Sequence, residues 1–80
     1  MTREEVFENV NEVFQDVFDD EDILVGEETT ADDIEDWDSL EQINLIVLLE
    51  KRFNIKFKIE EVNTMKNVGE MVDKIMERIG

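Results

Sequence analysis

The sequence contains neither cysteine nor histidine. Without cysteine, the chain can form no disulfide, thiol nucleophile or zinc–thiolate site, and nothing indicates its redox compartment. Without histidine, it lacks the commonest general base and the commonest ligand for transition metals. Any thiol or imidazole chemistry at this protein must therefore come from a prosthetic group or a partner.

Proline and tyrosine are also absent, and only three glycines occur among the 80 residues. A chain poor in these residues favours helices over strands. Its length suffices for one small domain, residues 1–80, and its 41% hydrophobic content suffices for a modest core. With no disulfide to help, we expect stability to depend on tight helix packing.

Basic residues are scarce, since 8 of them face 23 acidic residues and leave a net charge of −15. Such a surface repels nucleic acid and anionic membranes, so we expect neither as a partner. It attracts proteins with basic patches, although solubility alone explains the excess equally well. The first residues lack the apolar core of a signal peptide, and no stretch is long enough to span a bilayer. We therefore expect a cytoplasmic monomer.

The first helix is predicted from about Arg3 to about Phe18. Thr2 and Glu5 match a capping box in front of it, and valines and phenylalanines recur along it at helical spacing. The acidic residues 19–22 end the helix, because like charges at its C-terminus oppose its dipole. A long connection follows, from Asp19 to Trp37. Its apolar residues are expected to anchor it to the core: Ile23, Leu24, Val25 and Ile34.

The second helix is predicted from about Ser39 to Phe53, with Asn54 as its terminator. Its middle is apolar most of the way round. This fits a central helix covered on several sides, or a helix with one face exposed for a partner. Residues 55–59 alternate as a strand would, but no second strand exists to pair with them. We therefore expect an extended loop that buries its apolar residues: Ile55, Phe57 and Ile59.

Two further helices complete the prediction. A short one is expected from about Glu60 to Met65, and the last is expected to begin near Asn67 and to be followed by Gly80. The chain is thus predicted to be all-α, a four-helix bundle with three longer helices and one short helix. The long loop lies between the first and second helices.

The acidic runs raise the question of a calcium site. An EF-hand loop needs a glycine at its sixth position and a glutamate at its twelfth. Counted from Asp20, the sixth residue is Val25; counted from Asp32, the sixth is Trp37 and the twelfth is Ile43. Both registers fail, so we expect no specific metal site.

Catalysis by paired carboxylates would need one carboxylate in an apolar cleft. Nearly all the acidic residues fall on predicted exposed faces or loops. With histidine and cysteine also absent, we expect no catalytic residue and no enzyme activity.

Ser39 lies where the acidic connection ends and the second helix begins. A helix N-terminus collects unpaired N–H groups and the positive end of the dipole, so a phosphate carried there is stabilised. Ser39 and Gln42 match a capping box, which would occupy the serine in structure alone. Asp38 can cap the helix equally well, with Glu41 at the third helical position. In that case the Ser39 hydroxyl is free to accept a group from another enzyme, and the sequence leaves both alternatives open.

The run Asp36-Trp37-Asp38-Ser39-Leu40-Glu41, at the start of an apolar second helix in an acidic chain of this length, resembles that of acyl carrier proteins. The resemblance covers essentially the whole chain. It implies that Ser39 receives a phosphopantetheine arm from coenzyme A through a phosphopantetheinyl transferase. The thiol of the arm would hold acyl intermediates as thioesters for acyl-loading and acyl-transferring enzymes, while the carrier itself catalyses nothing. An imported thiol would also explain why the chain has no cysteine.

The resemblance further implies roles for residues of the second and third helices. The second helix is the family's recognition helix, and the implied contacts to partner enzymes with basic patches are Asp38, Leu40, Glu41, Asn44, Val47 and Glu50. An acyl chain sheltered between the two helices would meet Ile46, Leu49, Phe57, Val62 and Met65. An ordinary packed core explains this second set equally well.

Two residues depart from the carriers of fatty-acid synthesis, which usually have a small residue at the position of Trp37 and an acid at that of Asn44. The departures indicate a specialised pathway. An alternative is an aminoacyl or peptidyl carrier protein, although its serine more often follows a Gly-Gly pair that is absent here. An alternative from another class is an acidic helical adaptor without a prosthetic group, whose binding would not depend on Ser39.

Overall fold

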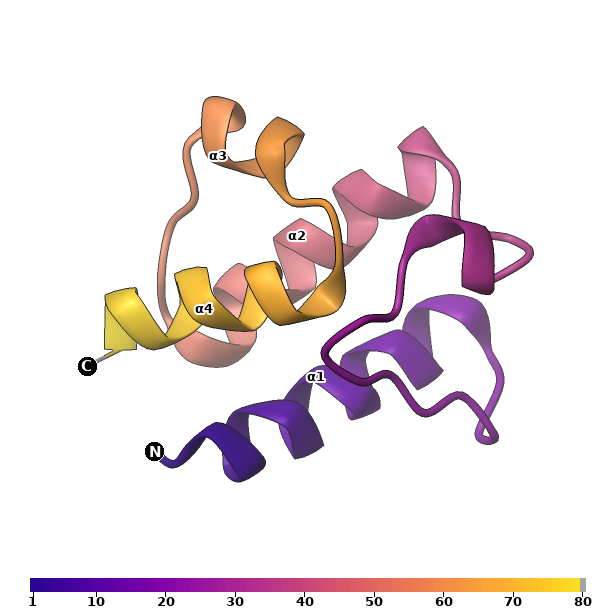
Figure 1. Ribbon diagram of the computed structural model, residues 1–80, viewed down its shortest axis with the longest axis horizontal. Helices are drawn as coiled ribbons and strands as arrows, with labels where there is room; N and C mark the ends of the chain where they lie inside the picture. The colour runs from indigo at the N-terminus through magenta and orange to yellow at the C-terminus, as the bar shows by residue number, and fades with distance from the viewer. Residues whose placement is uncertain (80) are drawn as a thin grey trace.

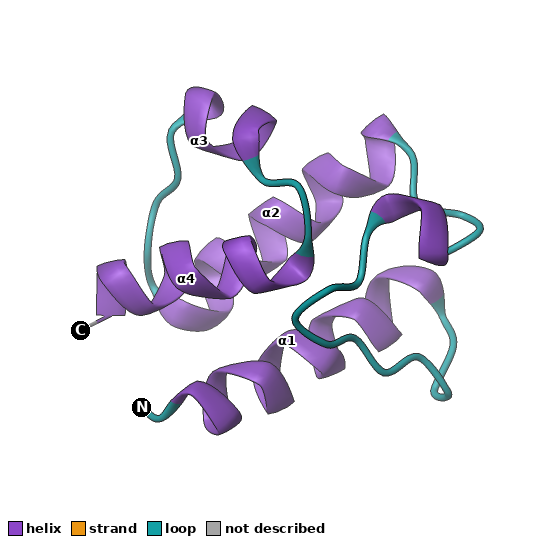
Figure 2. Cartoon of the chain, in the orientation of Figure 1, coloured by secondary structure: helices purple, strands orange, loops and turns teal. Residues whose placement is uncertain are grey.

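The computed structural model describes residues 1–79, which form helices joined by loops and contain no strand (Figures 1 and 2). The elements in this range are α1 (Arg3–Phe18), the 3-10 helix η1 (Ala31–Asp33), α2 (Ser39–Phe53), α3 (Ile59–Thr64) and α4 (Val68–Ile79). The predicted all-α architecture, with three longer helices and one short helix, is confirmed. Gly80, which was predicted to follow the last helix, lies outside the described residues.

Both ends of α1 are set by neighbouring polar residues. Thr2 N donates to Glu5 Oε1 at 2.8 Å and Glu5 N donates to Thr2 Oγ1 at 3.2 Å, so the predicted capping box is present. After α1, Asp19 adopts left-handed backbone with φ of 50°, as Asn54 does after α2 with φ of 54°. Asp and Asn tolerate this conformation better than most residues, which explains why both helices end where the sequence predicts.

The core lies where α1 packs against α2 and α4, which both run in the opposite direction to α1 (Figure 1). Each of these helices presents apolar residues three or four positions apart, a spacing that gathers them on one face. The fully buried side chains are Val6, Val10, Phe14, Leu45, Leu49, Val68, Met71, Val72 and Ile75. Within residues 1–79 no helix is both long and apolar enough to cross a membrane.

The long connection between α1 and α2 is fastened to α1 by two side-chain amides. Asn11 Oδ1 accepts a hydrogen bond from Val25 N at 2.6 Å, and Gln15 Nε2 donates to Ile23 O at 3.0 Å. Val25 is buried and Ile23 is half-buried, as predicted. Leu24 is 81% exposed, so its predicted burial is wrong. In a non-helical segment neighbouring side chains point to opposite sides, and the two flanking residues occupy the inner side.

The same connection supplies hydrogen bonds to the start of α4. Val68 N donates to Thr29 O at 2.8 Å, and Gly69 N donates to Glu27 O at 3.0 Å. These N–H groups lie in the first turn of the helix and have no partner within it. A Cβ atom at Gly69 would lie 2.6 Å from Glu27 O, so the close approach requires glycine.

Arg3 links α1, the connection and α4 at the surface. Its guanidinium group donates to both carboxylate oxygens of Glu27, at 2.8 and 2.6 Å, and to Asp73 Oδ1 at 2.8 Å. It also lies over the ring of Phe7, 5.6 Å from the centroid. The hydrogen bonds from Arg3 hold the pKa of the Glu27 carboxyl below its usual value.

The segment between α2 and α3 is held by charged side chains. Phe57 N donates to Glu50 Oε2 at 2.8 Å, and Arg78 Nε donates to Lys56 O at 2.8 Å while its guanidinium also pairs with Glu61. Ile55 and Phe57 are half-buried. Ile59 is 81% exposed, so its predicted burial is wrong. It is the first residue of α3, a helix that has no buried residue and lies on the outside of the bundle.

The Arg3–Glu27 pair predicts a pH-dependent contribution to stability. Because the pKa of Glu27 is lowered in the folded protein, the pair stabilises the fold above the usual glutamate pKa, and this contribution is lost as the pH falls through the lowered value. The wild type should be more stable than Arg3→Gln near neutral pH, and the difference should shrink between about pH 5 and pH 3. Thermal denaturation at each pH measures this difference. A difference that did not change with pH would show that Arg3 acts only through its packing on Phe7.

Candidate functional site

The start of α2 is set by Asp38. Its Oδ1 atom accepts a hydrogen bond from Glu41 N at 2.9 Å, and its carbonyl oxygen accepts one from Gln42 N at 2.9 Å. Asp38 is therefore the N-cap and Ser39 the first helical residue. Of the two alternatives that the sequence leaves open, this is the one in which the helix does not need the Ser39 hydroxyl.

The surroundings of Ser39 fit a covalently attached phosphate. The side chain is exposed and lies in the first turn of α2, where backbone N–H groups and the positive end of the helix dipole favour an anion. The neighbouring carboxylate of Asp38 already accepts the hydrogen bond from Glu41 N, and this bond offsets part of its negative charge. Helix geometry and exposure together leave Ser39 accessible to a modifying enzyme.

Trp37, the residue before the cap, contacts both α1 and α2. Its indole ring packs edge-on against Phe14, with centroids 5.2 Å apart, and lies 6.5 Å from the ring of Phe18. On the other side, Trp37 Nε1 donates to Gln42 Oε1 at 2.7 Å. The end of the connection is thus tied to α1 and to the first turn of α2. Sequence reasoning missed these contacts, because nothing in the local pattern shows which aromatic residues meet across the fold.

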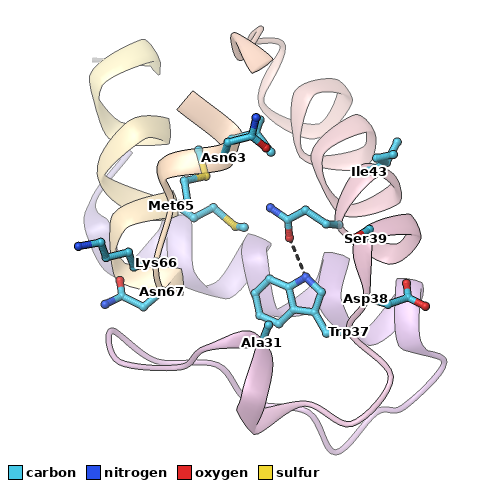
Figure 3. Close-up of a pocket in the computed structure, with 12 residues that line it drawn as sticks. Ala31, Trp37, Asp38, Ser39, Ile43, Asn63, Met65, Lys66 and Asn67 are labelled. Atoms are coloured by element: carbon cyan, nitrogen blue, oxygen red, sulfur yellow. Dashed lines mark hydrogen bonds between the residues drawn. The ribbon is translucent and has the colours of Figure 1, made fainter. Parts of the chain in front are cut away.

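A hollow of about 540 Å³ opens beside Ser39 (Figure 3). It lies between the start of α2, η1 and the segment that joins α3 to α4. Its lining residues are Ala31, Trp37, Asp38, Ser39, Gln42, Ile43, Val62, Asn63, Met65, Lys66, Asn67 and Met71. Half of them are polar or charged, and both methionines can adapt their shape to a bound group.

The structure does not gather the residues that were expected to shelter an acyl chain around one space. Val62 and Met65 line the hollow. Ile46 and Leu49 are 9% and 0% exposed and belong to the core, because the face of α2 that carries them packs toward α1. Phe57 is not among the residues that line the hollow, and its ring centroid lies 6.0 Å from the guanidinium of Arg78.

Of the six residues expected to contact partners, four are exposed and two, Glu41 and Glu50, are half-buried. Leu40 and Val47 are 65% and 43% exposed, and Asn44 is exposed between them on the same side of α2. Asp38 and Glu41 lie at the start of that face, at the cap and in the first turn. Ile43, which was not among the expected contacts, is 61% exposed and extends it.

Glu50, another of the expected partner contacts, makes a hydrogen bond within the fold. Its side chain is half-buried, and its carboxylate accepts the hydrogen bond from Phe57 N. It therefore holds the connection between α2 and α3. The contact depends on how the chain turns after Phe53, which the helical pattern does not predict.

Charge is distributed unevenly about Ser39. The sequence contains no basic residue between Arg3 and Lys51, so the connection and most of α2 carry only negative charge. Basic residues gather instead within residues 51–58, at the opposite end of α2 from Ser39. Asp36, Asp38 and Glu41 lie next to the serine in the sequence, and Lys66 lines the hollow beside it. The acidic residues favour the approach of a basic surface there.

Comparisons with known proteins find similarity over most of the chain. The sequence family described as "Phosphopantetheine attachment site" matches residues 8–75. An acyl carrier protein from Petrotoga mobilis is 34% identical over 80 residues, covering 99% of this chain and 93% of that protein. The solution NMR structure of the holo acyl carrier protein from Geobacter metallireducens has a TM-score of 0.87 and 40% sequence identity, and covers 92% of this chain and 85% of that chain.

The N-cap assignment predicts different costs for two neighbouring substitutions. Asp38→Ala should lower the free energy of unfolding by about 1 kcal/mol, because Glu41 N loses its acceptor. Ser39→Ala should change it far less. Asp36→Ala is the matched control, because it removes an equal charge from an exposed position one residue before Trp37. Urea denaturation followed by circular dichroism compares the three variants. A larger loss for Ser39→Ala than for Asp38→Ala would show that the serine is the cap.

Proposed function

This chain belongs to the acyl carrier protein family, and we propose that Ser39 is the residue to which its phosphopantetheine arm is attached. The proposal rests on one observation: Asp38 caps α2, which leaves the adjacent Ser39 hydroxyl exposed at the positive end of the helix. Ser39 is also the only serine in the sequence. When attached, the arm supplies a thiol that carries acyl groups as thioesters, and the chain itself has no cysteine.

In this proposal the chain contributes a nucleophilic oxygen but no base. Ser39 Oγ attacks the phosphorus that carries the pantetheine group of coenzyme A and becomes the ester oxygen; the pyrophosphate bond breaks, adenosine 3′,5′-bisphosphate leaves, and the serine proton passes to a group on the phosphopantetheinyl transferase. The chain has no histidine, and the carboxylate of Asp38, next to the serine, is bound to the Glu41 amide. The first turn of α2 then stabilises the negative charge of the phosphodiester.

We propose that partner enzymes dock on the exposed face of α2 that begins one residue after Ser39. Leu40, Ile43 and Val47 form an apolar ridge there, and Asp38 and Glu41 lie at its start. An apolar site with a basic rim on the partner would complement both features. Because the ridge follows the serine directly, docking on it brings the arm to the partner's active site.

Two residues support a specialised pathway for this carrier. Trp37 occupies the position before the cap and lines the hollow, where carriers of fatty-acid synthesis usually have a small residue. Asn44 leaves the exposed face of α2 without an acid between Glu41 and Glu50. Loading assays with acyl-activating and amino-acid-activating enzymes separate this proposal from an aminoacyl or peptidyl carrier.

Arm transfer tests the attachment site. Incubation with coenzyme A and a promiscuous phosphopantetheinyl transferase should raise the intact mass by one phosphopantetheine in the wild type and not in Ser39→Ala. Thr64→Ala is the matched control, since it removes another exposed hydroxyl and should keep the mass gain. No gain in the wild type, or a gain that persists in Ser39→Ala, would contradict the proposal.

The docking surface predicts how the transfer rate depends on salt. The rate should fall as ionic strength rises, because the negative charges around Ser39 steer encounter with a basic partner. Glu41→Gln should weaken this salt dependence. Leu40→Ala should slow the reaction and leave the salt dependence unchanged, because it removes an apolar contact and no charge. Transfer rates measured at several salt concentrations distinguish the two effects. A rate equal at low and high salt would rule out electrostatic steering.

A further inference from the structure

The hollow beside Ser39 is open to solvent along most of its lining. Met71 is buried, whereas the other lining residues are exposed or half-buried. Hydrophobic stabilisation grows with the apolar area removed from water. A long alkyl chain lying in this hollow would keep much of its surface in water, and would gain little from it.

Trp37 lies between the hollow and Phe14 of the bundle core, while the buried Met71 lines the hollow from α4. The indole lines the hollow, and its ring packs edge-on against Phe14, which is fully buried. Its N–H group is bound to Gln42, which also lines the hollow (Figure 3). Displacing the ring would therefore break a hydrogen bond and an aromatic contact at once.

Beyond Gln42, the inward-facing residues of α2 belong to the core. Leu45, Ile46 and Leu49 are each 9% exposed or less, and they pack in the same cluster as Phe14. None of the three lines the hollow. Toward Phe14 the hollow thus ends at Trp37 and Gln42, and along α2 it reaches no farther than Ile43.

The lining surface is mainly apolar, and three side-chain amides add polar groups to it. Side-chain amides of Gln42, Asn63 and Asn67 border the hollow, together with the apolar side chains of Val62 and Met65. The amide oxygens of Gln42 and Asn67 already accept hydrogen bonds from Trp37 Nε1 and Glu70 N, which leaves their N–H groups as donors. A hydroxyl or keto oxygen on a short acyl chain would accept from such N–H groups, whereas a long alkyl chain would not.

We propose that Trp37 is a specificity-determining residue: with Gln42 it closes the hollow toward the core, so that the carrier shelters short acyl groups with polar substituents and leaves long alkyl chains in solvent. The inference rests on the proposed attachment at Ser39, because only an arm that begins at the rim of the hollow brings its cargo there. Beyond that attachment, the inference names the class of acyl group, the cargo, that the arm carries.

Three cargoes loaded on the arm of the wild-type protein test the proposal. They are butanoyl, 3-hydroxybutanoyl and dodecanoyl groups, each compared with the unloaded arm by thermal denaturation. We expect 3-hydroxybutanoyl to raise the midpoint by several degrees, since a ligand that binds only the folded state stabilises it. Dodecanoyl should raise it no more than butanoyl does. A midpoint that rises steadily with chain length, or that no cargo changes, would overturn the proposal.

The fluorescence of Trp37 gives a second measurement on the same samples. It is the only tryptophan, and the chain has no tyrosine. We expect 3-hydroxybutanoyl to shift its emission, because this cargo lies against the indole, and dodecanoyl to shift it less. A larger shift with dodecanoyl would show that the long chain passes the ring and would overturn the proposal.

Two substitutions of Trp37 isolate the role of its ring. Trp37→Leu removes the wall toward Phe14, so dodecanoyl should now raise the midpoint by several degrees more than in the wild type. Trp37→Phe keeps a ring against Phe14 and should keep the wild-type order of cargoes. If Trp37→Leu folded and gave the wild-type order of cargoes, the indole ring would not limit the length of the acyl chain that the carrier shelters, and the proposal would be overturned. If it did not fold, the wild-type series would still decide.

Failure of this proposal is distinguishable from failure of the proposed function. If Ser39 carries no arm, no cargo can be loaded, and the mass measurement detects that before denaturation begins. If the arm and the cargoes load but the midpoint follows chain length, attachment at Ser39 stands and only the role of Trp37 is lost.

Discussion

The hydrogen bond from Glu41 N to Asp38 Oδ1 decides the register of α2, and the functional surface depends on that register. With Asp38 as the cap, Ser39 is the first helical residue and is exposed at the rim of the hollow. The same register turns Gln42 toward Trp37 and places Leu40, Ile43 and Val47 along the exposed face. A cap at Ser39 would occupy the hydroxyl that the arm needs. Capping and modification are therefore compatible, because Asp38 caps the helix and the adjacent Ser39 is left for the modification.

The long connection acts as part of the fold and positions the site. Asn11 and Gln15 bind its backbone on α1, and Glu27 and Thr29 accept hydrogen bonds from the first turn of α4. Trp37 then fixes its end against Phe14. These attachments hold η1 opposite the α3–α4 segment, so the hollow lies beside Ser39. A segment that carries only acidic charge thus gains order from polar contacts and a few apolar anchors.

The sequence predicts the helices well because their ends depend on local chemistry. Thr2 with Glu5 begins α1 and Asn54 ends α2, in each case through residues within a few positions of the helix end. Ser39 could be singled out for the same reason. Contacts between separate segments were not predictable: Glu50 accepts a hydrogen bond from Phe57 N, and Ile46 packs in the core instead of lining the hollow. Leu24 and Ile59 show that an apolar residue in a loop or at a helix start need not be buried.

The claim that Asp38 caps α2 while Ser39 carries the arm is tested most directly by amide NMR of the protein before and after arm transfer. The Glu41 amide reports on the cap, and the Ser39 and Leu40 amides report on the modification. We predict that attachment shifts the Ser39 and Leu40 signals and leaves the Glu41 amide protected from exchange with solvent. Loss of that protection, or a Ser39 signal that does not change when the arm is attached, would contradict the claim.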